Sequence, residues 1–300
     1  MPQPHVQYVE PAPGVRLWTE RRGAPDAPAL LLIMGAQASG IGWPDELCDA
    51  LAARHQVVRY DHRDTGRSTW SYDKEPYRIT DLADDVIAVL DGLGIERAHL
   101  VGMSLGGMLA QLVLCDHPDR VLSATLIGTN ALSTAPYVRP DGTTTAAEDL
   151  PGIDPRILQE WSQPVEDHGV EAELDRRVRH WQLLHGDAIP YDAEYFRAQE
   201  RRIIEHTGRY DSTFAHGRAD HSGMDRTEAL AATRVPVLVV EADAEPVFPL
   251  PHPRHLAQVT GAQVTVGGAA LVEIPGMGHA LPRPVLGPLA EAVLAHTAKV

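Results

Sequence analysis

The sequence predicts an α/β fold with a mostly parallel sheet, helices on both faces of the sheet and an inserted helical cap. Apolar runs such as residues 29–34 (ALLLIM) and 121–127 (VLSATLI) alternate with helix-like segments, and this alternation indicates right-handed crossovers between parallel strands. The alternation stops near residue 130 and resumes at residues 235–241 (VPVLVVE), with helical patterns but no buried strand run in between. We therefore expect a core of residues 1–131 and 227–300 and a cap of residues 132–226.

The individual elements follow from local patterns. The expected strands are residues 15–20 of an N-terminal hairpin, then 29–34, 56–60, 98–101, 121–127, 235–241 and 269–274. Continuous apolar runs among them are typical of strands buried on both faces. The expected core helices are residues 44–54, 80–93, 107–116, 253–259 and 286–297, and the expected cap helices are 154–161, 170–184 and 193–206. Thr80 is the expected N-cap of helix 80–93, and Asp81 and Asp84 suit the positive end of its dipole.

A serine lies in the sharpest turn that the sequence predicts. The stretch Gly102-Met103-Ser104-Leu105-Gly106 fits the pattern G-x-S-x-G between an expected strand and an expected helix, which is the context of a nucleophile elbow. A side chain at Gly102 or Gly106 would crowd such a turn, and the following helix directs its first N–H groups at developing negative charge. We expect Ser104 to be a catalytic nucleophile. The alternative is a tight strand-to-helix turn that happens to carry a serine.

A serine needs a base at neutral pH, and position singles out one of the fifteen histidines of the chain. His279 follows the last expected strand in a loop with two glycines, so it should lie at the same carboxyl-end rim of the sheet as Ser104. The base needs a carboxylate partner, which the chain order of nucleophile-elbow enzymes places between serine and histidine. The loop after strand 235–241 offers Asp243 and Glu245. We favour Glu245, and Asp243 is the alternative.

Attack by the serine creates an oxyanion that needs hydrogen-bond donors already in place. One donor is expected to be the backbone N–H of Leu105, the residue after the nucleophile. The other should come from the small-residue loop after strand 29–34, where we choose the backbone N–H of Ala36.

Other polar residues are better interpreted as structure. Asp61, Arg63, Asp64 and Arg67 lie in one turn near the expected site, and we expect a salt-bridged turn there rather than a substrate contact. Four further histidines show no recognised metal spacing and are expected to be solvated or core side chains: His216, His221, His252 and His255. The sequence therefore predicts neither a metal nor a cofactor.

The composition limits the partners. A chain of 300 residues fits one domain with an inserted subdomain, and a formal net charge of −15 argues against nucleic-acid or anionic-membrane partners. The first residues lack the pattern of a signal peptide, and no apolar run is long enough for a transmembrane helix. Cys48 and Cys115 are expected to be free buried thiols, so a cytoplasmic location is the default expectation. The oligomeric state does not follow from the sequence.

Aromatic side chains gather in the expected cap, where they form either its own core or a substrate pocket. We expect both roles, with Trp181 in the cap core and some of the other rings facing Ser104. The rings considered for the pocket are Trp161, Tyr191, Tyr195, Phe196 and Phe214.

Four motifs together resemble the α/β-hydrolase superfamily and, more narrowly, the anthracycline methyl esterases of polyketide biosynthesis: MGAQASGIGWPDEL, RYDHRDTGRST, VGMSLGG and IPGMGHALP. The resemblance spans nearly the whole chain. It implies an α/β-hydrolase fold with Ser104 as nucleophile, His279 as base, and Ala36 and Leu105 at the oxyanion positions. Glu245 stands where such esterases usually present an aspartate. The family hydrolyses the methyl ester on a tetracyclic polyketide without a cofactor.

The residues and the resemblance together predict a serine esterase that hydrolyses the methyl ester of a bulky aromatic or polyketide small molecule through an acyl-enzyme. One alternative is hydrolysis of a C–C bond or a lactone on the same triad, because one fold hosts many chemistries. The other is a non-catalytic ligand-binding protein with a hydrolase fold, and the complete triad argues against it.

Overall fold

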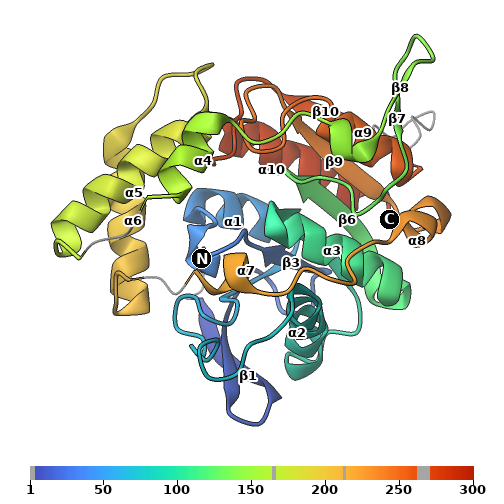
Figure 1. Cartoon of the computed structure of the whole chain (residues 1–300). Helices are drawn as coiled ribbons and strands as arrows, with labels where there is room; N and C mark the ends of the chain where they lie inside the picture. Colours follow the sequence, from blue (N-terminus) through green and yellow to red (C-terminus); the bar gives the residue numbers. More distant parts are fainter. Residues whose placement is uncertain (1–3, 164–166, 212–213, 262–270) are drawn as a thin grey trace.

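The computed structural model describes residues 4–163, 167–211, 214–261 and 271–300, and its centre is an eight-stranded sheet (Figure 1). The strands lie side by side in the order β1-β2-β4-β3-β5-β6-β9-β10. Their bounds are β1 His5–Ala12, β2 Val15–Arg22, β3 Ala29–Ile33, β4 Gln56–Tyr60, β5 Ala98–Met103, β6 Val121–Ile127, β9 Val237–Ala242 and β10 Leu271–Ile274.

The sheet is parallel except at one edge. β1 and β2 form an antiparallel hairpin, and β2 also pairs antiparallel with β4. All neighbours from β4 to β10 run parallel. The apolar runs of β3, β4 and β5 are buried along their whole length, because helices cover both faces of a parallel sheet. The expected strands are therefore confirmed, although residues 269–270 of the last one lie outside the described residues.

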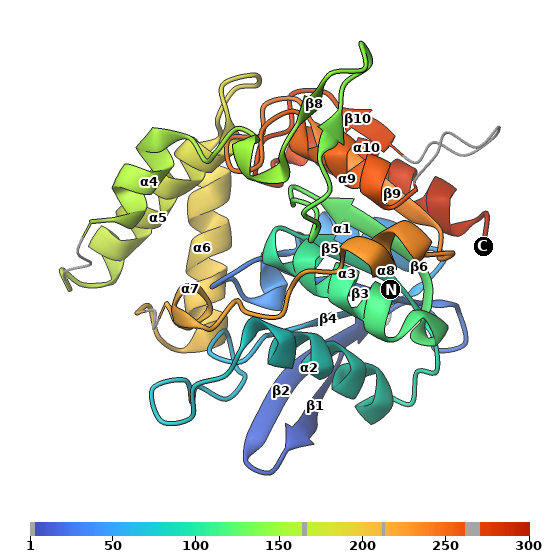
Figure 2. The same ribbon diagram turned by 45° about the vertical axis from the view of Figure 1, so that its right-hand side comes forward.

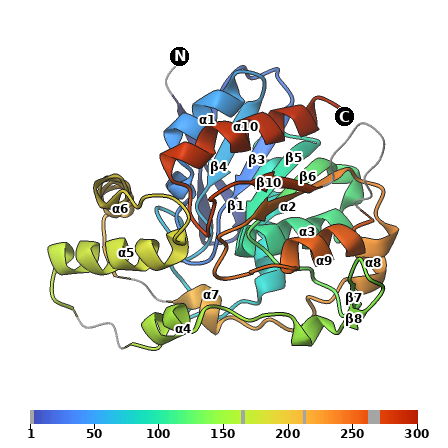
Figure 3. The same cartoon turned by 90° about the horizontal axis from the view of Figure 1, so that it is seen from above.

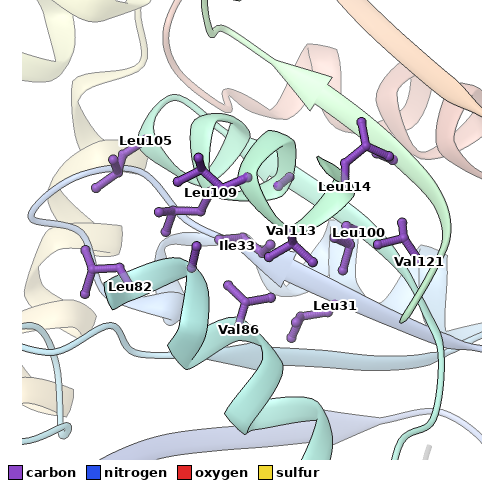
Figure 4. Packing of buried hydrophobic residues seen from close by; sticks show 14 of the residues in the cluster. Leu31, Ile33, Leu82, Val86, Leu100, Leu105, Leu109, Val113, Leu114 and Val121 are labelled. Atoms are coloured by element: carbon purple, nitrogen blue, oxygen red, sulfur yellow. The ribbon is translucent and has the colours of Figure 1, made fainter. Parts of the chain in front are cut away.

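Two layers of helices sandwich the sheet (Figure 3). Helices α1 Asp45–Ala52 and α10 Arg283–Thr297 pack on one face, and α2 Ile79–Gly92, α3 Leu105–Asp116 and α9 His252–Val259 pack on the other. Figure 4 shows α2 and α3 meeting the central strands through Leu82, Val86, Leu109, Val113, Leu31, Ile33 and Leu100. Fully burying one such side chain stabilises the fold by about 1.5–3 kcal/mol. This packing fixes the carboxyl ends of the strands, where the candidate site lies.

Between β6 and α8 (Thr227–Ala232) the chain leaves the sheet, and we call residues 132–226 the cap segment. It contains the short hairpin of β7 Tyr137–Val138 and β8 Thr144–Thr145 and the helices α4 Pro155–Trp161, α5 Val170–His185, α6 Ala193–Thr207 and α7 Ala215–Arg218. Helices α5 and α6 lie against each other to one side of the sheet (Figures 1 and 2). The hairpin was not expected, because two residues per strand leave no pattern to recognise. The division into core and cap remains an interpretation.

The expected N-cap of α2 is wrong. The helix begins at Ile79, so its N-cap is Arg78 rather than Thr80. The Asp81 carboxylate accepts the backbone N–H of Arg78 at 2.8 Å, while the Thr80 hydroxyl is buried without a hydrogen-bond partner in the described residues. An aspartate in the first turn thus satisfies the helix end that the threonine was expected to cap.

Candidate active site

Ser104 lies in a strained turn between β5 and α3. Its φ of 56° and ψ of −122° fall in a region that side chains rarely adopt, and its N–H donates to the Ile127 carbonyl at 2.9 Å. A Cβ on Gly102 would overlap the carbonyl oxygen of Gly106, and a Cβ on Gly106 would overlap that of Ile33. Both glycines are therefore required by the close approach of backbone segments, as expected for a nucleophile elbow.

The loop after β3 lies directly against the serine. A Cβ on Gly35 would stand 3.2 Å from Ser104 Cβ and 3.7 Å from Ser104 Oγ. Leu105 is the first residue of α3, where backbone N–H groups lack an intrahelical acceptor. Among the hydrogen bonds of the described residues, none uses the N–H of Leu105 or of Ala36. These two backbone N–H groups therefore stay the expected donors for an oxyanion.

The imidazole of His279 is paired with the carboxylate of Glu245. His279 Nδ1 donates to Glu245 Oε1 and Oε2, each at 2.9 Å, and both side chains are buried. Glu245 Oε1 also accepts the N–H groups of Val247 at 2.8 Å and Phe248 at 3.2 Å. Burial alone would raise the pKa of Glu245, but His279 and the two N–H donors outweigh it, and the pKa is lowered. The ionised carboxylate keeps the imidazole proton on Nδ1 and leaves Nε2 as the basic nitrogen.

Asp243, the alternative acid, has a different partner. Its Oδ1 accepts the N–H of Gly276 at 2.6 Å, and the residue is exposed. Asp243 therefore ties the loop that carries His279 back to the end of β9, while Glu245 contacts the imidazole.

The His279–Glu245 pair lies over the end of β6, next to the elbow. A Cβ on Gly128, the residue after β6, would stand 2.8 Å from Glu245 Oε2 and 3.1 Å from His279 Nδ1. The preceding residue, Ile127, accepts the N–H of Ser104. The hydrogen bonds of the described residues do not include one from Ser104 Oγ to His279. The contact between nucleophile and base therefore stays a prediction, as do the catalytic roles of the three residues.

The cap segment holds the loop of His279 from outside the sheet. The His279 N–H donates to the Leu184 carbonyl in the last turn of α5 at 2.7 Å. A Cβ on Gly278 would overlap the carbonyl oxygen of His185, so only glycine permits this approach. The Tyr195 hydroxyl of α6 donates to the Leu281 carbonyl at 3.0 Å.

Three of the five candidate pocket rings gather beside this loop. Tyr195 and Phe196 are buried against Ala280, and Tyr191 stacks on Phe196 with 5.1 Å between the ring centroids. Trp181 stacks on the same Phe196 at 5.6 Å. The other two candidates, Trp161 and Phe214, are 49 % and 44 % exposed. The rings that pack on Ala280 and on one another thus come from α5, α6 and the segment between them, whereas the ring in contact with His279 itself is Phe248, at 6.1 Å between ring centroids.

The charged turn at residues 61–67 does form ion pairs, and their partners lie on other elements. Arg63 forms a bidentate pair with Asp85 of α2 at 2.7 and 2.6 Å. Asp61, which is fully buried, accepts His206 Nε2 of α6 at 2.7 Å, and the Arg67 side chain donates to the His206 carbonyl. Asp64 accepts backbone N–H groups of the following loop. These charges join distant segments, so a local sequence pattern does not reveal their partners.

Three of the four histidines set aside from metal binding have backbone partners, and the fourth, His221, is exposed. His252 and His255 contact the carbonyls of Pro151 and Ala135 through Nε2, and His216 lies between two loops described below. Across the described ranges, no three or more His, Cys, Asp or Glu side chains are grouped to hold a metal ion.

Comparisons with known proteins agree with the fold. A family model described as alpha/beta hydrolase fold matches residues 28–282. Rhodomycin D methylesterase DauP of Streptomyces sp. (strain C5) is 40 % identical over 293 residues, which cover 94 % of this chain and 95 % of that protein. Rhodomycin D methylesterase DnrP of Streptomyces peucetius is 41 % identical over 295 residues, with 94 % and 95 % covered. The crystal structure of a hydrolase from Pseudomonas aeruginosa PA01 has a TM-score of 0.67 at 24 % identity, with 97 % of this chain and 98 % of that chain covered.

Proposed function

The chain belongs to the alpha/beta hydrolase family, and on that premise we propose that it is a serine esterase for the methyl ester of a bulky aromatic polyketide. Two independent observations support this proposal. The methylesterase relatives named above are similar to this chain over nearly its whole length. The paired His279 and Glu245, set beside the elbow serine, supply the base that such an ester hydrolysis needs.

The proposed reaction has two halves. Ser104 Oγ attacks the ester carbonyl while His279 Nε2 takes the hydroxyl proton, and the Glu245 carboxylate stabilises the imidazolium that forms. The N–H groups of Ala36 and Leu105 hold the oxyanion. The imidazolium then gives its proton to the leaving methoxide, methanol departs, and an acyl-enzyme remains. Water attacks this ester with His279 as base, which frees the carboxylic acid and restores Ser104.

The observation that carries the proposal is the contact of His279 Nδ1 with both carboxylate oxygens of Glu245. A merely structural histidine does not need an ionised partner that fixes its tautomer, whereas a general base does. The aromatic rings of the cap segment that pack beside Ala280, the residue after His279, favour a flat, bulky ligand, because apolar and aromatic walls are the norm in such pockets.

The test measures methanol release from an anthracycline methyl ester and labelling by a fluorophosphonate probe, with Ser104→Ala as the matched control. We expect wild-type protein to release one methanol per acid formed and to bind the probe covalently, and Ser104→Ala to do neither. Probe labelling without methanol release would indicate that the same triad hydrolyses another kind of bond, such as a C–C bond or a lactone. Ligand binding without labelling would make it a non-catalytic binding protein.

Two further features bear on partners and location. Cys48 and Cys115 are free thiols, which supports the expected reducing, cytoplasmic compartment. In the part of the chain that the structure describes, no helix has the length and apolar content needed to cross a bilayer. The proposed partner is the small-molecule ester, in line with the methylesterase relatives, and the proposed reaction uses no cofactor.

A further inference from the structure

The loop that carries the proposed oxyanion donor Ala36 is contacted from the cap segment. We call residues 35–40 the oxyanion loop. Its Gln37 has a φ of 61°, in the left-handed region that costs a non-glycine residue strain energy. The Gln37 N–H donates to Nδ1 of His216 at 3.0 Å, and His216 lies on α7, about 180 residues further along the chain.

The second nitrogen of His216 fixes how this contact is made. Nε2 lies 2.9 Å from the Arg63 carbonyl oxygen, and a carbonyl only accepts hydrogen bonds, so Nε2 carries the ring proton. Nδ1 then presents its lone pair to the Gln37 N–H. The ring is buried, and burial lowers the pKa of His216 to about 4. A neutral imidazole of one defined tautomer therefore spans the turn after β4 and the oxyanion loop.

The core holds the far end of the same loop. The Gly40 N–H donates to Asp61 Oδ1 at 2.8 Å, and the Ser39 hydroxyl donates to the same oxygen. These contacts fix residues 39 and 40 but leave the strained peptide between Ala36 and Gln37 to other partners. The His216 contact is made at that peptide, one residue from the N–H group that is proposed to bind the oxyanion.

We propose that His216 is a positioning residue for catalysis, which holds the Gln37 N–H so that the neighbouring Ala36 N–H faces the reacting carbonyl at Ser104. The inference rests on the proposed function, because the oxyanion loop has this role only in an acyl-transfer enzyme. By this inference, α7 of the cap segment helps to lower the activation barrier of ester hydrolysis, in addition to any contact of the cap with substrate. The expected signature is an effect on kcat rather than on KM, since the loop acts on the transition state.

Two substitutions test the contacts of the two ring nitrogens separately. His216→Asn places an amide oxygen near the position of Nδ1 and can still accept the Gln37 N–H. His216→Gln places its terminal amide near the position of Nε2, so it can still donate to the Arg63 carbonyl but leaves the Gln37 N–H without its acceptor. His55→Gln is the control for loss of a buried imidazole, because His55 is buried just before β4, at the opposite end of the parallel strands.

The experiment measures kcat and KM on p-nitrophenyl acetate and amide hydrogen exchange of a peptide covering residues 35–40. We expect His216→Gln to lower kcat about tenfold to a hundredfold, below the loss of a whole oxyanion donor, with KM within about twofold. His216→Asn should recover most of that loss, and His55→Gln should match wild type. Exchange at Gln37 should be faster in His216→Gln alone.

Several outcomes overturn the proposal. The proposal is wrong if His216→Gln has the kcat and the Gln37 amide exchange rate of wild-type protein. It is also wrong if His216→Asn and His216→Gln lose kcat equally. If His216→Gln does not fold, His216→Ala with added imidazole replaces it, and kcat that fails to rise with imidazole counts against the contact. Absence of any Ser104-dependent turnover in wild-type protein refutes the proposed function instead, and the exchange measurement then decides the loop contact by itself.

Discussion

Replacing Glu245 with glutamine removes the negative charge that faces the proposed base His279 while nearly keeping the shape of the side chain. Glu245 Oε1 accepts the N–H groups of Val247 and Phe248 in addition to the His279 contact. In the variant the amide oxygen should stay with these two backbone donors, because an NH₂ group there would face N–H groups. The amide nitrogen then donates to His279 Nδ1, so Nδ1 must act as an acceptor and cannot carry the ring proton. The ring proton moves to Nε2, and Nε2 can no longer take the Ser104 proton.

The expected loss follows from the geometry. Opposite unit charges 2.9 Å apart, at an effective dielectric constant of about 20, attract each other by about 5–6 kcal/mol. This stabilisation of the imidazolium disappears in Glu245→Gln. Since about 1.4 kcal/mol corresponds to a factor of ten in rate, kcat should fall about 10⁴-fold. A wrong imidazole tautomer in a serine triad has an effect of the same size.

The assay is steady-state hydrolysis of the methyl ester, with Asp243→Asn as the matched control. Asparagine keeps an oxygen that can accept the Gly276 N–H, so this variant should retain wild-type kcat within about threefold, the effect of one modest hydrogen bond. The reasoning is refuted if Glu245→Gln stays within tenfold of wild type while folded. It is also refuted if Asp243→Asn loses the larger share of activity.

Four further predictions concern the nucleophile, the elbow, acid stability and the pocket. Ser104→Ala should lower kcat about 10⁶-fold with an unchanged circular dichroism spectrum, because the triad acts as a unit; a loss below tenfold would place the chemistry elsewhere. Gly106→Ala sets a methyl group against the Ile33 carbonyl, so guanidinium unfolding should show a loss of about 1–3 kcal/mol, and an unchanged midpoint would contradict this. His216 is neutral when folded, with a pKa of about 4, and takes up its proton more readily when unfolded. Thermal stability should therefore fall as the pH drops from about 6.5 to about 4, less steeply in His216→Asn, and parallel melting curves would argue against it. Phe196→Ala should raise KM for an anthracycline methyl ester more than for p-nitrophenyl acetate, since only the bulky ligand needs the rings; equal changes would count against an aromatic pocket.

The fold could be predicted because its signals are local. Continuous apolar runs mark the buried strands, and the glycines around Ser104 mark a turn in which backbone segments meet. The same local reasoning was wrong at Thr80, because helix starts two residues apart differ too little in free energy for the sequence to distinguish them. Helix boundaries are decided by such small differences, whereas strand identity is decided by burial of whole runs.

The polar contacts of the site depend on residues far apart in the chain. Asp243 and Glu245 are two residues apart, and only the path of the loop turns one toward Gly276 and the other toward His279. Asp61 finds its partner His206 on a cap helix. Position at the rim of the sheet is what makes Ser104 and His279 candidates for catalysis, but no local pattern links the cap histidines to the core.

The contact between the His279 loop and the last turn of α5 matters for chimeras in which the cap segment is taken from a related protein. The Leu184 carbonyl and the closely packed Gly278 set where the loop 275–279 stands. A cap transplanted from a relative with a differently ended α5 would therefore displace the imidazole while it changed the pocket. Under the proposed function, a change of cap would alter substrate range and turnover together, so a working chimera must carry loop 275–279 along with α5, which supports it.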